Sequence, residues 1–138
     1  MPKRIAVVGS GAVGGYLGGH LARTGQDVTL IDPWPEHVEA IRARGLQLSG
    51  MTDEETCTVK LPTMHLTELQ SLSKQRPIDI AIVSAKSYDT EWSTLMIQPY
   101  LSADGFVVSA QNSINEETIA RVVGLDPYVP SCARLVQR

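Results

Sequence analysis

The sequence has few of the features that mark membrane, secreted and metal-binding proteins. It contains only two cysteines, Cys57 and Cys132, with no CxxC pair and no histidine at ligand spacing, so neither a disulfide framework nor a zinc site is expected. Its apolar runs, such as residues 5–8 and 80–83, are far shorter than the ~20 residues that cross a bilayer. Glycines interrupt the N-terminal apolar segment before a secretory signal core can form. We therefore predict a cytoplasmic protein that binds no metal and no membrane.

An excess of charge of either sign is also missing. Twelve Lys and Arg against fifteen Asp and Glu give a formal net charge of −3, which is too small to favour nucleic acid or anionic lipid as a partner. The hydrophobic share of 43% and the charged share of 20% are ordinary for a folded protein. The length suits one domain, which we place at residues 1–138. The composition leaves homo-oligomer formation open.

Predicted strands and helices alternate along the chain. Apolar, β-branched runs predict strands at residues 4–8, 28–31, 78–85 and 106–110. Helical spacing and helix-end signals predict helices at residues 12–24, 36–44, 67–73, 89–98 and 115–123. Weaker patterns predict short strands at residues 46–49 and 58–61 and a final strand within 131–136. This alternation predicts an α/β fold with a doubly wound, mostly parallel sheet of the Rossmann type and helices on both faces.

Glycine is concentrated near the N-terminus, where seven of the eleven glycines lie within the first 25 residues. The segment from Gly9 to Gly14 matches GxGxxG directly after the first predicted strand and at the start of the first predicted helix. The first glycine permits a tight turn, the second lets the backbone approach a pyrophosphate, and the third lets the helix lie close to the strand. The candidate cofactor-binding residues of this loop are Gly9, Ser10, Gly11, Ala12, Val13 and Gly14. The alternative is that these glycines serve packing alone.

Asp32 supports the binding interpretation. It lies 18 residues after Gly14, close to the ~20-residue spacing at which a carboxylate accepts hydrogen bonds from the ribose of NAD. Its alternative role is that of a helix-entry or turn residue. A nucleoside-triphosphate loop would need GxxxxGK, whereas Gly14 is followed by Gly15 and Tyr16. We therefore predict a nicotinamide dinucleotide as cofactor, ahead of a flavin or a methyl donor.

The aromatic and imidazole side chains carry weaker signals. Trp34, two residues after Asp32, is a candidate to stack on adenine, and packing against the following helix is the alternative. His20, His37 and His65 are scattered, which favours structural roles over catalysis. We assign no catalytic histidine.

Residues 5–14, 25–32, 85–90 and 111–112 resemble the N-terminal domain of the 2-dehydropantoate 2-reductase, or ketopantoate reductase, family. The resemblance implies an NAD(P)-dependent oxidoreductase of pantothenate biosynthesis, which transfers hydride from NAD(P)H to a 2-keto acid such as 2-dehydropantoate. In that family the lysine matching Lys86 lies along the cofactor cleft, and the asparagine matching Asn112 reaches the nicotinamide and substrate region. Lys86 and Asn112 are therefore further cofactor-binding candidates, and Asn112 is a candidate to orient the reacting groups.

The residues alone leave other roles open for both. The alternative for Lys86 is a solvated loop lysine, and the alternative for Asn112 is a turn former or helix cap. Ser113 stands where the family usually has glycine after Gln-Asn. The family also carries a second, helical domain with the principal catalytic lysine, and we expect these 138 residues to lack that domain and that acid.

The cofactor form and the function each keep an alternative. The resemblance favours NADP(H), whereas Asp32 favours NAD(H), because a carboxylate repels the 2′-phosphate. The favoured function is the cofactor-binding domain of a ketopantoate-reductase-like enzyme. The alternative is a stand-alone nucleotide-sensing regulatory module without catalysis.

Overall fold

A parallel β-sheet forms the centre of the molecule. The computed structural model describes residues 2–111, 115–123 and 134–135. The sheet has the strand order β5-β2-β1-β6-β7-β8, and all its neighbouring strands are parallel. The strands are β1 (Arg4–Val8), β2 (Asp27–Asp32), β5 (Thr63–His65), β6 (Ile78–Val83), β7 (Leu101–Ser109) and β8 (Arg134–Leu135). The predicted Rossmann-type α/β fold is confirmed.

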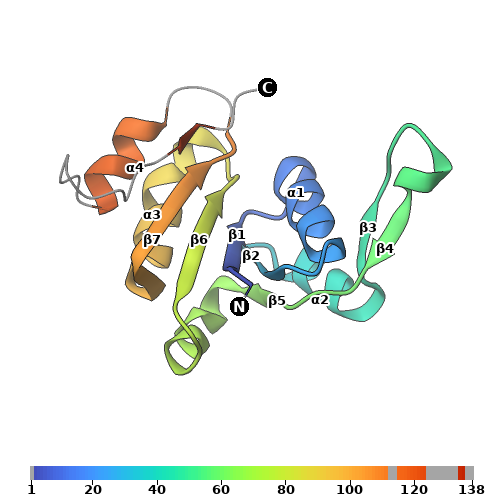
Figure 1. The fold of residues 1–138 in the computed structure, drawn as a ribbon, viewed down its shortest axis with the longest axis horizontal. Helices are drawn as coiled ribbons and strands as arrows, with labels where there is room; N and C mark the ends of the chain where they lie inside the picture. The colour runs from blue at the N-terminus through green and yellow to red at the C-terminus, as the bar shows by residue number, and fades with distance from the viewer. Residues whose placement is uncertain (1, 112–114, 124–133, 136–138) are drawn as a thin grey trace.

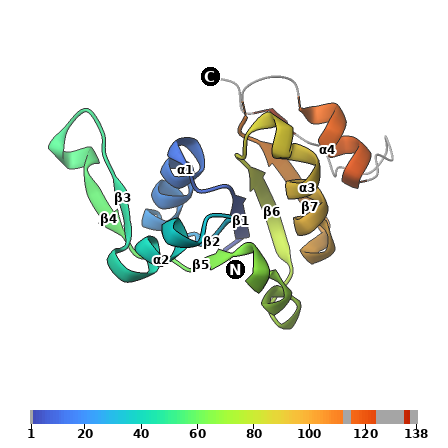
Figure 2. The same cartoon turned by 180° about the vertical axis from the view of Figure 1, so that it is seen from behind.

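The connections divide between the two faces of the sheet. One face carries α1 (Ala12–Arg23), α2 (Pro35–Arg44) and an antiparallel hairpin of β3 (Leu46–Leu48) and β4 (Cys57–Val59), and Figures 1 and 2 show these elements grouped on one side. The other face carries the 3-10 helix η2 (Leu66–Lys74), α3 (Thr90–Ile97) and α4 (Glu116–Val123). Single 3-10 turns complete the chain at η1 (Asp53–Glu55), η3 (Ser87–Asp89) and η4 (Gln98–Tyr100).

The central strand β1 packs on both faces because its side chains alternate. Ile5 and Val7 belong to the apolar cluster beneath α1, α2 and the hairpin. Ala6 and Val8 belong to the cluster beneath η2, α3 and α4. All four side chains are buried, and each fully buried valine or isoleucine contributes roughly 1.5–3 kcal/mol to folding. A continuous apolar run is therefore the expected sequence of this strand.

Strand order reverses next to β1. The chain proceeds from β1 to β2 and then to β5 on one side, and it returns to place β6 and then β7 on the other side. The connections that leave the carboxyl ends of β1 and β6 therefore run in opposite directions across the sheet. In open α/β sheets, this switch point is the place where ligands bind.

Several predicted boundaries differ from the observed ones. The strand predicted at 106–110 begins at Leu101, because its first residue pairs with Ile78 of β6 across a register shift. The strand predicted to reach residue 85 ends at Val83. The helix predicted at 67–73 is a 3-10 helix, and its leucines Leu66, Leu69 and Leu72 recur every three residues, which matches three residues per turn.

Strand β5 was not predicted, and part of the final strand cannot be compared. Thr63–His65 has no long apolar run of its own and becomes a strand by pairing with the edge of β2. Of the strand predicted within 131–136, Arg134–Leu135 forms β8, and the rest lies outside the described residues. None of the helices in the described ranges is long and apolar enough to cross a membrane.

Candidate functional site

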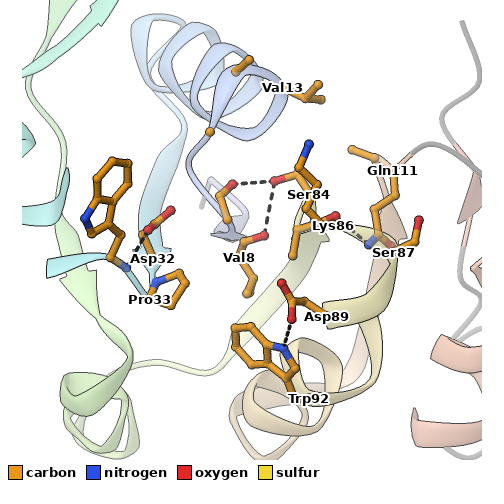
Figure 3. A pocket seen from close by; sticks show the side chains of 16 residues that line it. Val8, Val13, Asp32, Pro33, Ser84, Lys86, Ser87, Asp89, Trp92 and Gln111 are labelled. Carbon is orange, nitrogen blue, oxygen red and sulfur yellow. Dashed lines mark hydrogen bonds between the residues drawn. The ribbon is translucent and has the colours of Figure 1, made fainter. Parts of the chain in front are cut away.

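A cleft of about 470 Å³ opens at the carboxyl ends of β1 and β6, the switch point of the sheet. Figure 3 shows Asp32 and Pro33 on one side of it and Lys86, Ser87 and Gln111 on the opposite side. The predicted residues that line it are Gly9, Gly11, Ala12, Val13, Asp32 and Lys86. Ser10 and Gly14 lie behind this lining, and Asn112 lies outside the described residues.

Two glycines of the loop are required by the fold itself. Gly9 has φ +94°, and a β-carbon there would lie 2.9 Å from the Ala85 backbone nitrogen. A β-carbon on Gly14 would lie 1.9 Å from the Gly9 carbonyl oxygen and 2.2 Å from Ser84 Oγ. These two positions agree with the predicted tight turn and the close approach of helix to strand.

Gly11 differs from both. A β-carbon built on Gly11 meets nothing within 4 Å, and its φ of −71° is open to any residue. Packing therefore does not explain this glycine. The open space adjoins the cleft that Gly11 lines, which is where a ligand approaching the backbone would need room.

The first turn of α1 offers backbone donors to that space. Its N-cap is Gly11, no side chain caps it, and no acidic residue lies in the first turn. The first N–H groups of an α-helix have no partner within the helix, and the helix dipole makes this end positive. Ala12 and Val13 of this turn line the cleft. The end of α1 is therefore suited to a phosphate group.

Asp32 is buried and holds the glycine loop in place. Its Oδ2 accepts hydrogen bonds from the Ser10 backbone nitrogen at 2.8 Å and from Ser10 Oγ at 2.9 Å. Its Oδ1 accepts from the Trp34 backbone nitrogen at 2.9 Å. A carboxylate has about four lone-pair positions, so one remains for a further donor such as a ribose hydroxyl. Asp32 thus combines the predicted cleft position with a structural role.

Further side chains brace the loop. Ser84 Oγ donates to the Gly9 carbonyl oxygen at 2.6 Å, and His37 Nε2 donates to the Ser10 carbonyl oxygen at 2.8 Å. His37 therefore has the structural role that was predicted for it. Ser84 was missed from the sequence, and its only signal was its place directly after a buried strand.

Trp34 lines the cleft and is 62% exposed. Its ring stacks on the imidazole of His37, with 6.1 Å between centroids and 29° between planes. His37 belongs to α2, so Trp34 packs on the start of the following helix, as the alternative predicted, and its large exposed fraction leaves the rest of the ring open to the cleft. Trp92 and Asp89, which the sequence did not single out as site residues, also line the cleft, and Trp92 Nε1 donates to Asp89 Oδ1 at 2.6 Å.

Charge in the cleft is divided among three side chains. Among the described residues that line it, Lys86 is the cation, and Asp32 and Asp89 are the acids. No group of three or more His, Cys, Asp or Glu side chains in the described ranges is placed to hold a metal ion.

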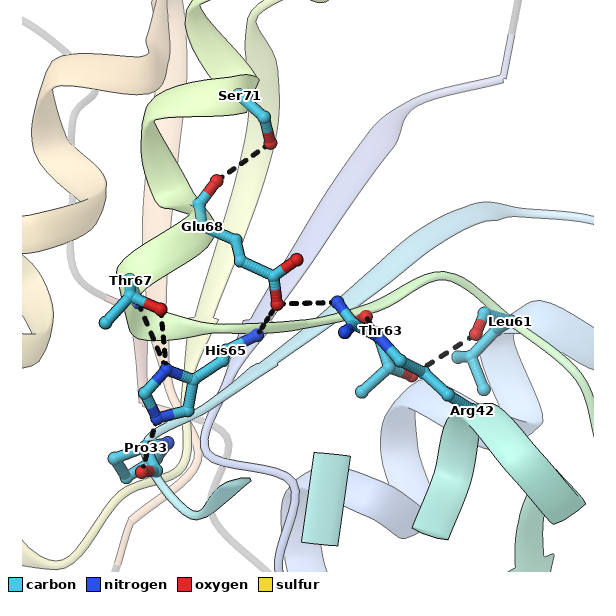
Figure 4. Close-up of polar contacts among 8 residues, drawn as sticks. All are labelled: Pro33, Arg42, Leu61, Thr63, His65, Thr67, Glu68 and Ser71. Carbon is cyan, nitrogen blue, oxygen red and sulfur yellow. Dashed lines mark hydrogen bonds and ion pairs between the residues drawn. The ribbon is translucent and has the colours of Figure 1, made fainter. Parts of the chain in front are cut away.

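Arg42, a cation near the Asp32 end, is engaged elsewhere (Figure 4). Its guanidinium donates to the Thr63 carbonyl oxygen at 2.8 Å and pairs with Glu68 at 2.6 Å. Hydrogen bonds from the His65 amide and then from Arg42 lower the pKa of Glu68 below its ordinary value of 4.5. His65 Nε2 in turn donates to the Pro33 carbonyl oxygen at 2.8 Å. This network links β5, η2 and α2 to the loop that follows Asp32.

Comparisons with known proteins agree with the fold. A family model described as "Ketopantoate reductase PanE/ApbA" matches residues 5–133. The 2-dehydropantoate 2-reductase of Pyrococcus horikoshii is 38% identical over 122 residues, which make up 88% of this chain and 37% of the relative. The enzyme of the same name from Lactococcus lactis subsp. lactis is 36% identical over 87% of this chain and 37% of the relative. The chain thus spans little more than a third of these relatives.

Solved structures give the same picture. A PanE/ApbA family ketopantoate reductase from Ralstonia eutropha JMP134 superposes with a TM-score of 0.75 and 32% identity, over 96% of this chain and 39% of that one. A D-mandelate dehydrogenase, solved in a ternary structure with NADH and anilino(oxo)acetate, has a TM-score of 0.76 and 32% identity, over 88% of this chain and 38% of that one.

Proposed function

Because the chain belongs to the ketopantoate reductase family, we propose that it is the dinucleotide-binding part of an oxidoreductase that reduces a 2-keto acid. The observation that carries the proposal is the open space beside Gly11, at the uncapped start of α1 and on the wall of the cleft. Gly9 and Gly14 have close neighbours that explain their lack of a side chain, and Gly11 has none. A ligand that approaches the backbone closely at Gly11 explains the glycine there.

The chain's own residues divide the binding of the dinucleotide. The pyrophosphate lies against Gly11 and the first turn of α1, where backbone N–H groups and the helix dipole stabilise its charge. A ribose hydroxyl donates to Asp32. The exposed ring of Trp34 stacks on the adenine, and the ammonium of Lys86 provides the positive charge on the opposite side of the cleft.

The reaction needs two donations to one carbonyl group. The bound nicotinamide supplies a hydride for the carbonyl carbon, and an acid supplies a proton for its oxygen, which gives a 2-hydroxy acid. In this proposal the residues of this chain bind and orient the cofactor, Asn112 orients the reacting groups, and the second domain of the family holds the proton donor. The oxoacetate bound by the related D-mandelate dehydrogenase supports a 2-keto acid as substrate.

We further propose NAD(H) as the preferred cofactor, against the NADP(H) that the family resemblance favoured. A 2′-phosphate beside the Asp32 carboxylate would be repelled and would find no compensating charge from Arg42, which pairs with Glu68. Asp89 adds a second negative group to the cleft. The related D-mandelate dehydrogenase was solved with NADH, which supports the same preference.

Turnover by the full-length protein tests this function. We expect NADH to be oxidised when ketopantoate or another 2-keto acid is added, and we expect Lys86→Met to lower kcat/KM by about tenfold or more because the charge on that side of the cleft is lost. Glu54→Gln, in the exposed turn η1 between β3 and β4 and not among the residues that line the cleft, is the matched control and should change kcat/KM by less than about twofold. If the full-length protein binds NADH but none of the 2-keto acids causes NADH oxidation, the result would instead favour the regulatory module.

A further inference from the structure

The backbone on both sides of Lys86 is held by side chains from other elements. Gln111, which follows β7, donates from Nε2 to the Ala85 carbonyl oxygen at 2.8 Å. Thr90, the first residue of α3, donates from Oγ1 to the Ser87 carbonyl oxygen at 2.8 Å. Lys86 lies between these two carbonyl groups on the wall of the cleft, as Figure 3 shows together with Ser87 and Gln111.

The two holding groups are bonded to each other. Gln111 Nε2 also donates to Thr90 Oγ1 at 2.8 Å, so both hydrogens of the amide nitrogen are used. A carbonyl oxygen can only accept, which requires the nitrogen end of the Gln111 amide to face Ala85. The oxygen end, Oε1, accepts from the Ser109 hydroxyl at 3.2 Å. Every bond in this set fits one orientation of the amide.

The network is built into the protein rather than spread over its surface. Thr90 is 1% exposed and Ser109 is fully buried. Asn115, at the start of α4, is also buried and donates from Nδ2 to Ser87 Oγ at 3.3 Å. Hydrogen bonds between buried groups are costly to break, because the separated donor and acceptor cannot bond to water instead. The segment before and after Lys86 is thus held from β7, α3 and α4.

We propose that Gln111 and Thr90 are positioning residues that fix Lys86 for its contact with the dinucleotide. A lysine side chain is long and flexible, so a mobile backbone beneath it would add to the entropy lost when its ammonium is fixed on a ligand. Lys86 is the one cation among the described residues that line the cleft, so its placement affects affinity directly. The inference rests on the proposed binding of a nicotinamide dinucleotide.

A double-mutant cycle separates positioning from general stability. Gln111→Met and Thr90→Val remove the donors with little change of shape, and Thr90→Ser keeps the hydroxyl as the matched control. We expect Gln111→Met and Thr90→Val each to raise the Kd for NADH about fivefold or more when Lys86 is present, and Thr90→Ser to recover affinity to within about twofold of the parent. In a Lys86→Met background, the same two substitutions should change Kd by less than about twofold.

The measurement is isothermal titration calorimetry of the chain with NADH, with the melting temperature of each variant recorded beside it. Equal losses with and without Lys86, or no loss with Lys86 present, would overturn the positioning role. If Thr90→Val fails to fold because its site is buried, Gln111→Met at the cleft edge still completes the cycle. A parent chain that binds no NADH would overturn the proposed function together with this inference, whereas a parent that binds and variants that behave additively would overturn this inference alone.

Discussion

Gly14→Ala is expected to destabilise the domain severely, whereas Gly11→Ala, three positions earlier, is expected to fold normally and to bind NADH more weakly. The added β-carbon of Gly14→Ala would lie 1.9 Å from the Gly9 carbonyl oxygen, and a backbone group cannot rotate away as a side chain can. Overpacking of this kind costs about 3 kcal/mol, and helix and strand would have to separate. We expect the melting temperature to fall by roughly 10 °C.

Gly11→Ala isolates the binding role of the loop. Its added β-carbon meets no protein atom within 4 Å, and its backbone conformation suits alanine, so the melting temperature should stay within about 2 °C of the parent. The same methyl group occupies the space assigned to the pyrophosphate. We therefore expect the Kd for NADH to rise about tenfold or more, equivalent to about 1.4 kcal/mol of binding free energy.

Thermal unfolding and calorimetric titration of the two variants provide the measurements. Gly25→Ala is a useful third variant because Gly25 has φ +87° with no neighbour within 4 Å, so it strains the backbone far from the cleft. It should lower stability modestly without changing the Kd for NADH. Unchanged affinity in Gly11→Ala would show that the space beside Gly11 does not receive the ligand.

Asp32→Asn is expected to change which dinucleotide binds. The substitution removes the charge that repels a 2′-phosphate and weakens the acceptor offered to a ribose hydroxyl. We expect the ratio of NADPH to NADH affinity to rise about tenfold or more, with most of the change in the weaker binding of NADH. The ratio is informative because a general loosening of the loop would weaken both dinucleotides alike.

Asp32→Asn is also expected to lower stability. Its Oδ2 accepts two hydrogen bonds from Ser10, and an amide nitrogen at that position would face the same donors without accepting from them. Bonds to a charged acceptor contribute about 1.5–3 kcal/mol each, so we expect a loss of about 2–4 kcal/mol in the free energy of unfolding. Chemical denaturation measures this loss, and Glu54→Gln in the exposed turn η1 is the charge-matched control outside the cleft. A variant with parental stability and an unchanged cofactor ratio would contradict both roles assigned to Asp32.

The parts of the fold that could be predicted are those with local sequence signals. β1 is an apolar run ended by a glycine, and α1 is framed by Gly11 and Gly25, so both follow from short-range patterns. β5 could not be predicted, because Thr63–His65 becomes a strand only beside β2. The early start of β7 was missed for a similar reason, since Asp104 and Gly105 interrupt an apolar pattern that pairing with β6 overrides.

The features of the site also divide into those with a local sequence signal and those without one. The position of the glycine loop and Asp32 beside the cleft could be predicted because their spacing along the chain is fixed by the βαβ geometry. The hydrogen bond between Asp32 and Ser10 was not foreseen, and neither was the clamp of Ser84 on the Gly9 carbonyl group. Both depend on residues that are distant in sequence and meet only when β1, β2 and β6 align. A linear motif carries no signal for such contacts.

The most direct test of the proposed function is a calorimetric titration of the parent chain with NADH and, separately, with NADPH. We expect one NADH to bind per chain and NADPH to bind about tenfold or more weakly, because the Asp32 carboxylate on the cleft wall would accept a ribose hydroxyl and repel a phosphate in the same place. Binding of neither dinucleotide, or tighter binding of NADPH than of NADH, would contradict it.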